Sequence, residues 1–524
     1  MGNTNSLIQA ENWENRVKAC VALLRRWKFR KLSFKGKALV VNSLVISKLV
    51  YLVTVLPVPG WVINSIRASV TDFIWGGKKP LISYKTLLLP IIKGGLNLSD
   101  VETKRDSLRI KYIGKLFNNN VNRKLKMSML YFLNLYDSMN LGLNIFQIDS
   151  RSKSLMHMHP FYREMLLAWK RLTRNNFVEP LTREEILFQP IFHNPHICDE
   201  NSEMLFNRTF IESGIILVSD LMYEMLPCQL PAEAVLEYMT FANPDNPITI
   251  SDVEEFIATF MNSLPESWLA KIFSSDKMIS TQSDFKFTIK FIQGADILDA
   301  SRLNCKQISD ILRNDTNHIP TGQVHWNSLF TDLSFTNRWF NVYKSPKCLF
   351  DADIDFKIMH NILFTNEKLF KFNMVDSSLC TLCKTSIETI NHLFIECPII
   401  VDLWNHIITK LDNFNIIKCY DEWRVVTLFG AGLTRKNKHG VLIDFMLNIY
   451  KCVIWKSRNS LIAIGGTINI NIFFHNFMRK KIHLIYEVYR KNNNLQKFFD
   501  FFGRNNVLLS ANRDNSFNYH LDSG

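Results

Sequence analysis

Residues 380–397 read CTLCKTSIETINHLFIEC, and this stretch decides the local fold because it holds a complete set of metal ligands. The spacing is Cys-x2-Cys-x8-His-x4-Cys, which offers three thiolates and one imidazole from Cys380, Cys383, His392 and Cys397. Zn²⁺ prefers sulfur and nitrogen ligands and is four-coordinate in structural sites. The sequence therefore predicts a closed Zn²⁺ site. Such a site leaves no open position for activating water, which points to a binding protein rather than a hydrolase.

The alternative interpretation is that these are ordinary reduced core residues, because free cysteine is among the most buried residue types. The other seven cysteines are scattered along the chain and form no second pair. Compact Cys/His spacing is typical of zinc sites, so we favour the metal. Ten cysteines without a pairing pattern in 524 residues also indicate a reducing compartment.

The segments beside this array predict helices. Pro398 follows the last cysteine and can open a helix at its first position. Apolar residues then recur at helical spacing through Ile400, Leu403, Trp404, Ile407, Ile408 and Leu411. Upstream, DADID at 351–355 resembles the start of a calcium loop, but Phe356 replaces the glycine and Ile362 the final glutamate that such a loop needs. We expect these aspartates in the first turn of a helix instead.

The charge of the chain is concentrated at one end. Net charge is +14, and residues 1–120 hold 20 Lys and Arg against 6 Asp and Glu, so the remaining 404 residues are neutral overall. An excess of this kind is the electrostatic footprint of a polyanion partner, most simply a phosphate backbone.

Residues 25–37, RRWKFRKLSFKGK, are the densest basic segment, with seven basic residues among thirteen. We predict that they contact nucleic-acid phosphates; the seven are Arg25, Arg26, Lys28, Arg30, Lys31, Lys35 and Lys37. Aromatic Trp27, Phe29 and Phe34 are interleaved and could stack on unpaired bases. For the aromatics we favour the other interpretation, in which they point into a core.

The N-terminal sequence carries no secretory signal, because MGNTNSLIQAENWENR lacks an apolar core. We therefore expect the nucleus and/or cytoplasm. Gly2 and Ser6 match the N-myristoylation pattern, but one acyl chain anchors only marginally. Residues 38–58 are long and apolar enough to raise a transmembrane helix, yet Lys48 lies mid-span. We predict a buried helix of a soluble domain and no membrane partner.

Several motifs together resemble the part of a non-LTR (LINE-type) retrotransposon polyprotein that lies downstream of its reverse transcriptase core. Near the N-terminus these are W-x-x-R-K-L-S-x-x-G-K-A from Trp27, S-K-L-x-Y from Ser47, F-I-W-x-x-K from Phe73 and G-G-L-x-L-x-D from Gly94, which are similar to the post-polymerase thumb region. The C-terminal part resembles the reverse-transcriptase zinc-binding domain. It holds the Cys-x2-Cys pair, E-T-x-x-H-L-F-x-x-C-P from Glu388 and I-W-x-x-R-N from Ile454.

We predict a mainly α protein with a thumb-like helical region at 1–118, a helical middle region of unknown role at 119–340, a zinc-binding domain at 341–460 and a helical tail with a frayed end at 461–524. The resemblance covers the first and third of these regions, and the middle region matches no family. Within the zinc-binding domain we expect a small Cys3His knuckle with flanking helices. The resemblance also implies Zn²⁺ on Cys380, Cys383, His392 and Cys397, and RNA or DNA as partners. These would be a retroelement RNA template or target DNA, with an upstream polymerase polypeptide as a further partner.

The sequence departs from the parent family in its catalytic motifs. It shows no Tyr-x-Asp-Asp polymerase signature and no endonuclease constellation, and two-metal phosphoryl chemistry needs clustered carboxylates. As it stands, we therefore predict a non-catalytic, nucleic-acid-binding retroelement protein. The alternative is a zinc-stabilised structural or adaptor protein that engages a protein partner.

Overall fold

The computed structural model is mainly α-helical, as the sequence predicts. It describes residues 2–117, 122–135, 139, 141–149, 158–173, 182–223, 228–244, 248–273, 290–293, 296–299, 302–314, 318–330, 333–344, 346–413, 419–433, 437–503, 508–512 and 516–520. Within these ranges the strands form two antiparallel hairpins, β1 (Lys290–Gln293) with β2 (Asp296–Asp299) and β3 (Leu509–Ala511) with β4 (Phe517–Tyr519).

The chain separates into two compact units, each built from three separate stretches. The first unit contains residues 1–15, 49–64 and 100–316, and the second contains residues 16–48, 65–99 and 317–524. The basic segment 25–37 and the Cys/His array therefore belong to the same unit. The four consecutive segments expected from the sequence stay a prediction.

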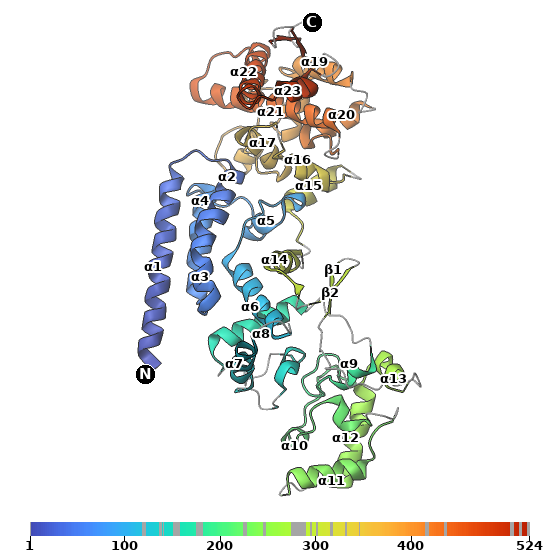
Figure 1. Ribbon diagram of the computed structural model, residues 1–524. Helices are drawn as coiled ribbons and strands as arrows, with labels where there is room; N and C mark the ends of the chain where they lie inside the picture. Colours follow the sequence, from blue (N-terminus) through green and yellow to red (C-terminus); the bar gives the residue numbers. More distant parts are fainter. Residues whose placement is uncertain are drawn as a thin grey trace. The chain divides into compact units, whose positions relative to one another are not determined.

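Three elements run across the division: α1 (Gly2–Lys28), α3 (Ser47–Val55) and α4 (Gly60–Trp75). The other helices of the first unit are α6 (Val101–Phe117), α7 (Arg123–Asn134), η3 (Gly142–Phe146), α8 (Pro160–Thr173), α9 (Arg183–Leu187), α10 (Arg208–Glu212), η5 (Val218–Leu221), α11 (Ala232–Ala242), α12 (Ile250–Ser263), α13 (Glu266–Ile272) and α14 (Cys305–Asn314). Helix α6 packs against α8 and α14 around a continuous apolar core (Figure 1).

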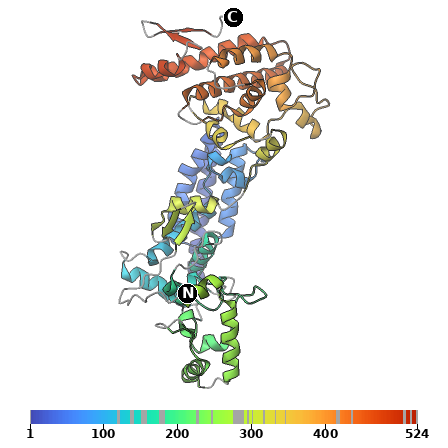
Figure 2. The ribbon, with the colours of Figure 1, turned by 90° about the vertical axis from the view of Figure 1, so that its right-hand side faces the viewer.

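The second unit holds the remaining helices. These are α2 (Phe34–Val40), η1 (Val41–Ile46), α5 (Tyr84–Leu88), η2 (Ile91–Lys93), α15 (Thr321–Leu329), α16 (Thr336–Asn341), α17 (Leu349–Met359), α18 (Asn366–Lys371), η7 (His392–Glu396), α19 (Val401–Asp412), α20 (Tyr420–Phe429), α21 (Lys438–Ile464), α22 (Ile470–Lys491) and α23 (Leu495–Phe502). The long helix α21 packs against α17, α22, α23 and η7, and α21 and α22 lie side by side in both views (Figures 1 and 2).

Residues Phe34–Val55 form one continuous helical stretch through α2, η1 and α3. By length and composition alone this stretch could cross a membrane, and 44% of its apolar window is buried inside the protein. Val41, Val45 and Leu49 are buried, whereas Leu39 and Tyr51 are exposed. The expected buried helix is therefore buried along one face.

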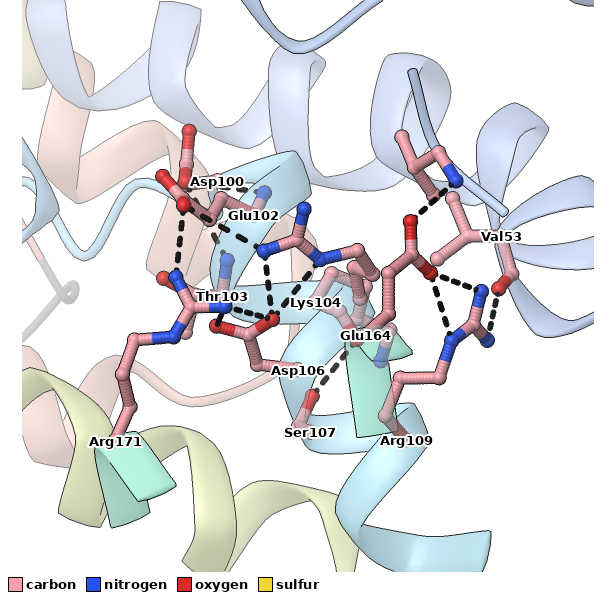
Figure 3. Close-up of polar contacts among 12 residues, drawn as sticks. Val53, Asp100, Glu102, Thr103, Lys104, Asp106, Ser107, Arg109, Glu164 and Arg171 are labelled. Carbon is pink, nitrogen blue, oxygen red and sulfur yellow. Dashed lines mark hydrogen bonds and ion pairs between the residues drawn. The ribbon is translucent and has the colours of Figure 1, made fainter. Parts of the chain in front are cut away.

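A buried arginine holds the end of this stretch in the first unit (Figure 3). The Arg109 guanidinium on α6 is fully buried and donates to the carbonyl oxygens of Val53 and Leu56, each at 2.7 Å. Its charge is paired with Glu164 of α8 at 2.7 Å, and the same carboxylate accepts the backbone N–H of Val58. The last carbonyls of a helix have no intrahelical partner, so Arg109 caps α3 and fixes the turn that follows.

Candidate metal centre and nucleic-acid interface

The first two donors lie in a tight loop that is closed by backbone pairing. An antiparallel bridge joins Leu379 to Ile387, and the Cys380 N–H donates to the Ser386 carbonyl at 2.7 Å. The Lys384 N–H donates back to the Cys380 carbonyl at 2.8 Å, with Lys384 itself in the left-handed region at φ 59°. The loop therefore turns sharply enough to aim both cysteine side chains at one point.

The other two donors are set by a short π-helix, η7, which begins at His392. The Cys397 N–H donates to the His392 carbonyl at 2.8 Å, a bond between residues five apart. A π-turn widens the helix by one residue and is frequent at functional sites. The Thr389 hydroxyl accepts the His392 N–H at 2.9 Å and caps the turn. The π-turn thus places His392 and Cys397, which are separated by four residues, side by side.

The four donor atoms meet as one group, with all of them within 4.8 Å of one another. The Cys380 and Cys397 sulfurs are 4.0 Å apart, and the Cys383 sulfur lies 3.3 Å from His392 Nε2. Tetrahedral Zn²⁺ with bonds of about 2.3 Å to sulfur places two sulfurs about 3.8 Å apart. The donor set and its spacing therefore fit Zn²⁺.

Local hydrogen bonds lower the thiol pKa of two of the three cysteines, against the effect of burial. Cys380, Cys397 and His392 are buried, while Cys383 is partly exposed. The hydrogen bond with Cys397 lowers the pKa of the Cys380 thiol to about 6, and the same shared proton raises the pKa of Cys397. Burial opposes the thiolate at Cys383, but hydrogen bonds from Thr385 bring its net pKa below the usual value. Metal binding would displace the remaining protons.

A buried ion pair between Glu388 and Arg458 holds the backbone of the metal loop. Glu388 is completely buried, and its carboxylate accepts the Thr381 N–H at 2.8 Å, directly after the first ligand. The same carboxylate accepts the Asn366 N–H at 2.9 Å and two bonds from Arg458 of α21, at 2.8 and 3.1 Å. The sequence motifs contain both charged residues, but no local pattern pairs them.

The aspartates of DADID lie on helix α17, and each has protein partners. Asp351 lies in the first turn with the Lys481 ammonium against it, whereas Asp353 and Asp355 lie beyond that turn, so the expected position is confirmed for Asp351 alone. Asp355 lies further along and is enclosed by Lys347 at 3.0 Å and Lys451 at 2.9 Å, which together lower its pKa against the effect of burial. These contacts agree with the rejection of a calcium loop.

The seven basic residues of segment 25–37 divide into two groups. Arg25, Arg26, Arg30 and Lys31 are exposed at or just beyond the end of α1. The other three are held by the protein: Lys28 pairs with Asp72 at 2.8 Å, Lys35 lies over the Tyr343 ring, and Lys37 donates to the Ile74 carbonyl at 2.7 Å. Burial lowers the pKa of Lys37.

The aromatics of the segment also divide. Phe34 packs against Trp75 and Phe356, each with ring centroids 5.4 Å apart, so it points into the core as expected. Trp27 is half-buried beneath the Arg30 guanidinium. Phe29 is 91% exposed, and the expectation that it points inward is wrong. Phe29 directly follows the last residue of α1, where the chain turns away from the helix.

Direct contacts tie the basic segment to helix α17 of the metal-bearing part. The Phe34 backbone N–H, at the start of α2, donates to both carboxylate oxygens of Asp353 at 3.2 Å. The Tyr343 hydroxyl donates to the same carboxylate at 2.9 Å. Burial raises the pKa of Asp353 to about 6. The basic segment is thus bonded to helix α17, which belongs to the same compact unit as the metal loop.

Comparison with known proteins relates the chain to a zinc-binding family and to a transposon protein. Residues 305–404 match the family described as zinc-binding in reverse transcriptase, which covers the four donors, whereas Arg458 lies beyond the match. The chain is also 22% identical over 531 residues to the Transposon TX1 uncharacterized 149 kDa protein of Xenopus laevis. That alignment covers 96% of this chain and 40% of the relative, so the chain spans less than half of the relative's length.

Proposed function

We propose that this chain binds nucleic acid without catalysing a reaction itself. The chain carries a reverse-transcriptase zinc-binding domain and is similar to a LINE-type transposon protein along nearly its whole length. The ligand would be retroelement RNA or target DNA. A polymerase polypeptide would supply the chemistry. The contact of Phe34 with Asp353 carries the proposal, because it holds a basic segment on the same helix-bearing body as the metal loop.

The proposed roles follow from the chemistry of each part. Exposed Arg25, Arg26, Arg30 and Lys31 bind phosphates and supply affinity without reading sequence. Zn²⁺ held by Cys380, Cys383, His392 and Cys397 would crosslink a loop that is otherwise closed mainly by a few backbone bonds. With four protein ligands around it, the ion serves folding rather than reaction chemistry.

Charge reversal tests the proposal on the full-length, zinc-loaded chain. We expect the variant R25E/R26E/R30E/K31E to lose most of its affinity for labelled RNA and DNA, measured by fluorescence anisotropy. Lys28 is left unchanged because its pair with Asp72 is structural. The matched control reverses four exposed basic residues elsewhere: Arg123, Lys124, Lys480 and Lys491. Equal losses in the two variants would reduce the effect to net charge and contradict a localised site.

One observation favours the adaptor alternative. Phe372, Met374 and Ile387, near the metal loop in sequence, are 61%, 67% and 53% exposed. Exposed apolar side chains of this size can contribute to a protein contact. Under this alternative, chelation of zinc unfolds residues 341–460 without any effect on nucleic acid, and the charge-reversed variant behaves like the unchanged protein.

A further inference from the structure

The Phe29 ring is exposed to solvent beside basic residues, whereas the nearby Phe34 ring is packed in the core. Phe29 is 91% exposed, and among the described residues its ring has no aromatic contact. Arg26, Lys28 and Arg30 surround it in sequence, each exposed. A single exposed apolar residue needs no explanation by itself. Here the basic residues beside Phe29 indicate the kind of partner that could cover the ring.

A second basic element adjoins the first through the end of α4. Lys28 pairs with Asp72 of α4 at 2.8 Å, and a Cβ on Gly77 would lie 3.2 Å from the Lys28 ammonium. The Gly77 N–H donates to the Asp72 carbonyl at 2.9 Å, and both Gly76 and Gly77 have positive φ, so the chain turns tightly against Lys28. The next residues, 78 and 79, are exposed lysines.

Acidic residues are scarce in the chain segments that form this surface. Between Glu14 and Asp100 the sequence contains one acidic residue, Asp72, and its carboxylate is already paired with Lys28. Two chain segments that lie far apart in sequence therefore present one cationic surface, residues 25–31 with 78–79, around one exposed ring. A surface of this charge selects a polyanion.

We propose that Phe29 is a base-stacking residue and that residues 25–31 and 78–79 form a surface for single-stranded nucleic acid. The inference rests on the proposed function and deepens it. Bases in a duplex already stack on one another, so a protruding ring finds a free base face only on unpaired strands. The cations on either side of Phe29 hold the flanking phosphates. The ring then adds affinity for single strands that the charges alone do not give.

The test compares variants of the full-length, zinc-loaded chain on labelled oligouridine and on duplex RNA of equal length. Stacking contributes about 1–3 kcal/mol per base, so we expect Phe29→Ala to weaken oligouridine binding roughly 5- to 150-fold and to leave duplex binding unchanged. Phe29→Trp should retain the oligouridine affinity of the unchanged protein. K78E/K79E should weaken the binding of both RNAs. The matched control is Phe241→Ala, which removes an 87% exposed ring on α11 near Glu233 and Glu237 and should change neither.

The outcomes separate this inference from the proposed function. If the unchanged protein binds neither of these RNAs and no single-stranded or duplex DNA, the proposed function fails and the inference fails with it. If it binds both and Phe29→Ala has no effect, or weakens duplex binding equally, the inference alone is wrong. Phe29-dependent binding to phosphatidylserine vesicles, with RNA binding unaffected, would assign the ring to a membrane surface and also overturn it.

Discussion

Arg458 of helix α21 reaches across 70 residues of sequence to donate two hydrogen bonds to the fully buried carboxylate of Glu388. That carboxylate also holds the backbone of Thr381, the residue after the first metal ligand. The position of the metal loop thus depends on a helix outside the residues that match the zinc-binding family. Outer partners of this kind orient ligands and tune metal affinity.

Breaking this pair should weaken both the fold and the metal site. Glu388→Gln leaves Arg458 buried without its counter-charge, which costs about 3–5 kcal/mol of unfolding free energy in such pairs. Loss of ligand orientation should lower zinc affinity about 10- to 100-fold, measured by competition with a chromophoric chelator. The double variant E388Q/R458Q should cost less than the sum of the single variants.

The control for this prediction is an exposed pair on the neighbouring helix α18. Lys371 contacts Glu367 at 2.6 Å with the lysine side chain 67% exposed. Glu367→Gln should change stability by less than about 1 kcal/mol and leave zinc affinity unchanged. A comparable loss of zinc in E367Q would show that the Glu388 effect is not specific.

Metal stoichiometry should depend on the four ligands and on no other cysteine tested. The purified chain is expected to hold one Zn²⁺, measured by elemental analysis, and Cys383→Ser should lose it. Cys383 is the most accessible of the three sulfur ligands, so its replacement disturbs packing least. Exposed Cys348→Ser is the matched control and should retain the metal. Cobalt substitution adds a spectroscopic check, since thiolate-bound tetrahedral Co²⁺ absorbs strongly.

Replacement of Arg109 should destabilise the first unit. Arg109→Leu removes the cap on α3 and leaves Glu164 unpaired, for an expected loss of about 3–5 kcal/mol in urea denaturation. The surface pair of Arg208 with Glu212, whose arginine side chain is 81% exposed, provides the comparison. Arg208→Leu should have a much smaller effect, because solvent screens an exposed pair. Equal effects would mean that the buried geometry around Arg109 adds nothing.

Stability should fall as pH rises through the titration of Asp353. Its folded-state pKa of about 6 lies above the value near 4 of an unfolded aspartate, so the folded protein holds the proton more tightly. Its contribution is therefore complete below about pH 4 and is lost as the pH rises to about 6. Relative to Asp353→Asn, the unchanged protein should lose about 2–3 kcal/mol of unfolding free energy across this window. A constant difference between the two would contradict the assignment.

Local sequence patterns predicted the features that depend on residues close together in the chain. The mainly α fold and the helix beginning near Ile400 follow from helical spacing, and Leu403, Trp404 and Ile407 are buried as expected. The four metal donors meet because all of them lie within 18 residues of the chain. The zinc-binding region and the retroelement resemblance, inferred from short motifs, are confirmed by the family match and the transposon relative.

Contacts between residues far apart in the chain could not be predicted from the sequence. Nothing local to Phe34 indicates that its N–H bonds to Asp353, 319 residues away, or that Glu388 is neutralised from α21. Exposure was equally hidden, since Phe29 and Phe34 lie in the same basic context and differ only in where α1 ends and α2 begins. The ligand residues and basic residues remain predictions until metal and nucleic acid are measured.

The salt dependence of nucleic-acid binding measures directly how many phosphates the basic segment contacts. The logarithm of the association constant for single-stranded RNA should fall linearly with the logarithm of salt concentration, by about 0.7 for each phosphate contact. Reversal of Arg25, Arg26, Arg30 and Lys31 should reduce this slope by up to about 3. Affinity that stays flat with salt in the unchanged protein, or a slope that the four reversals leave intact, would contradict the account.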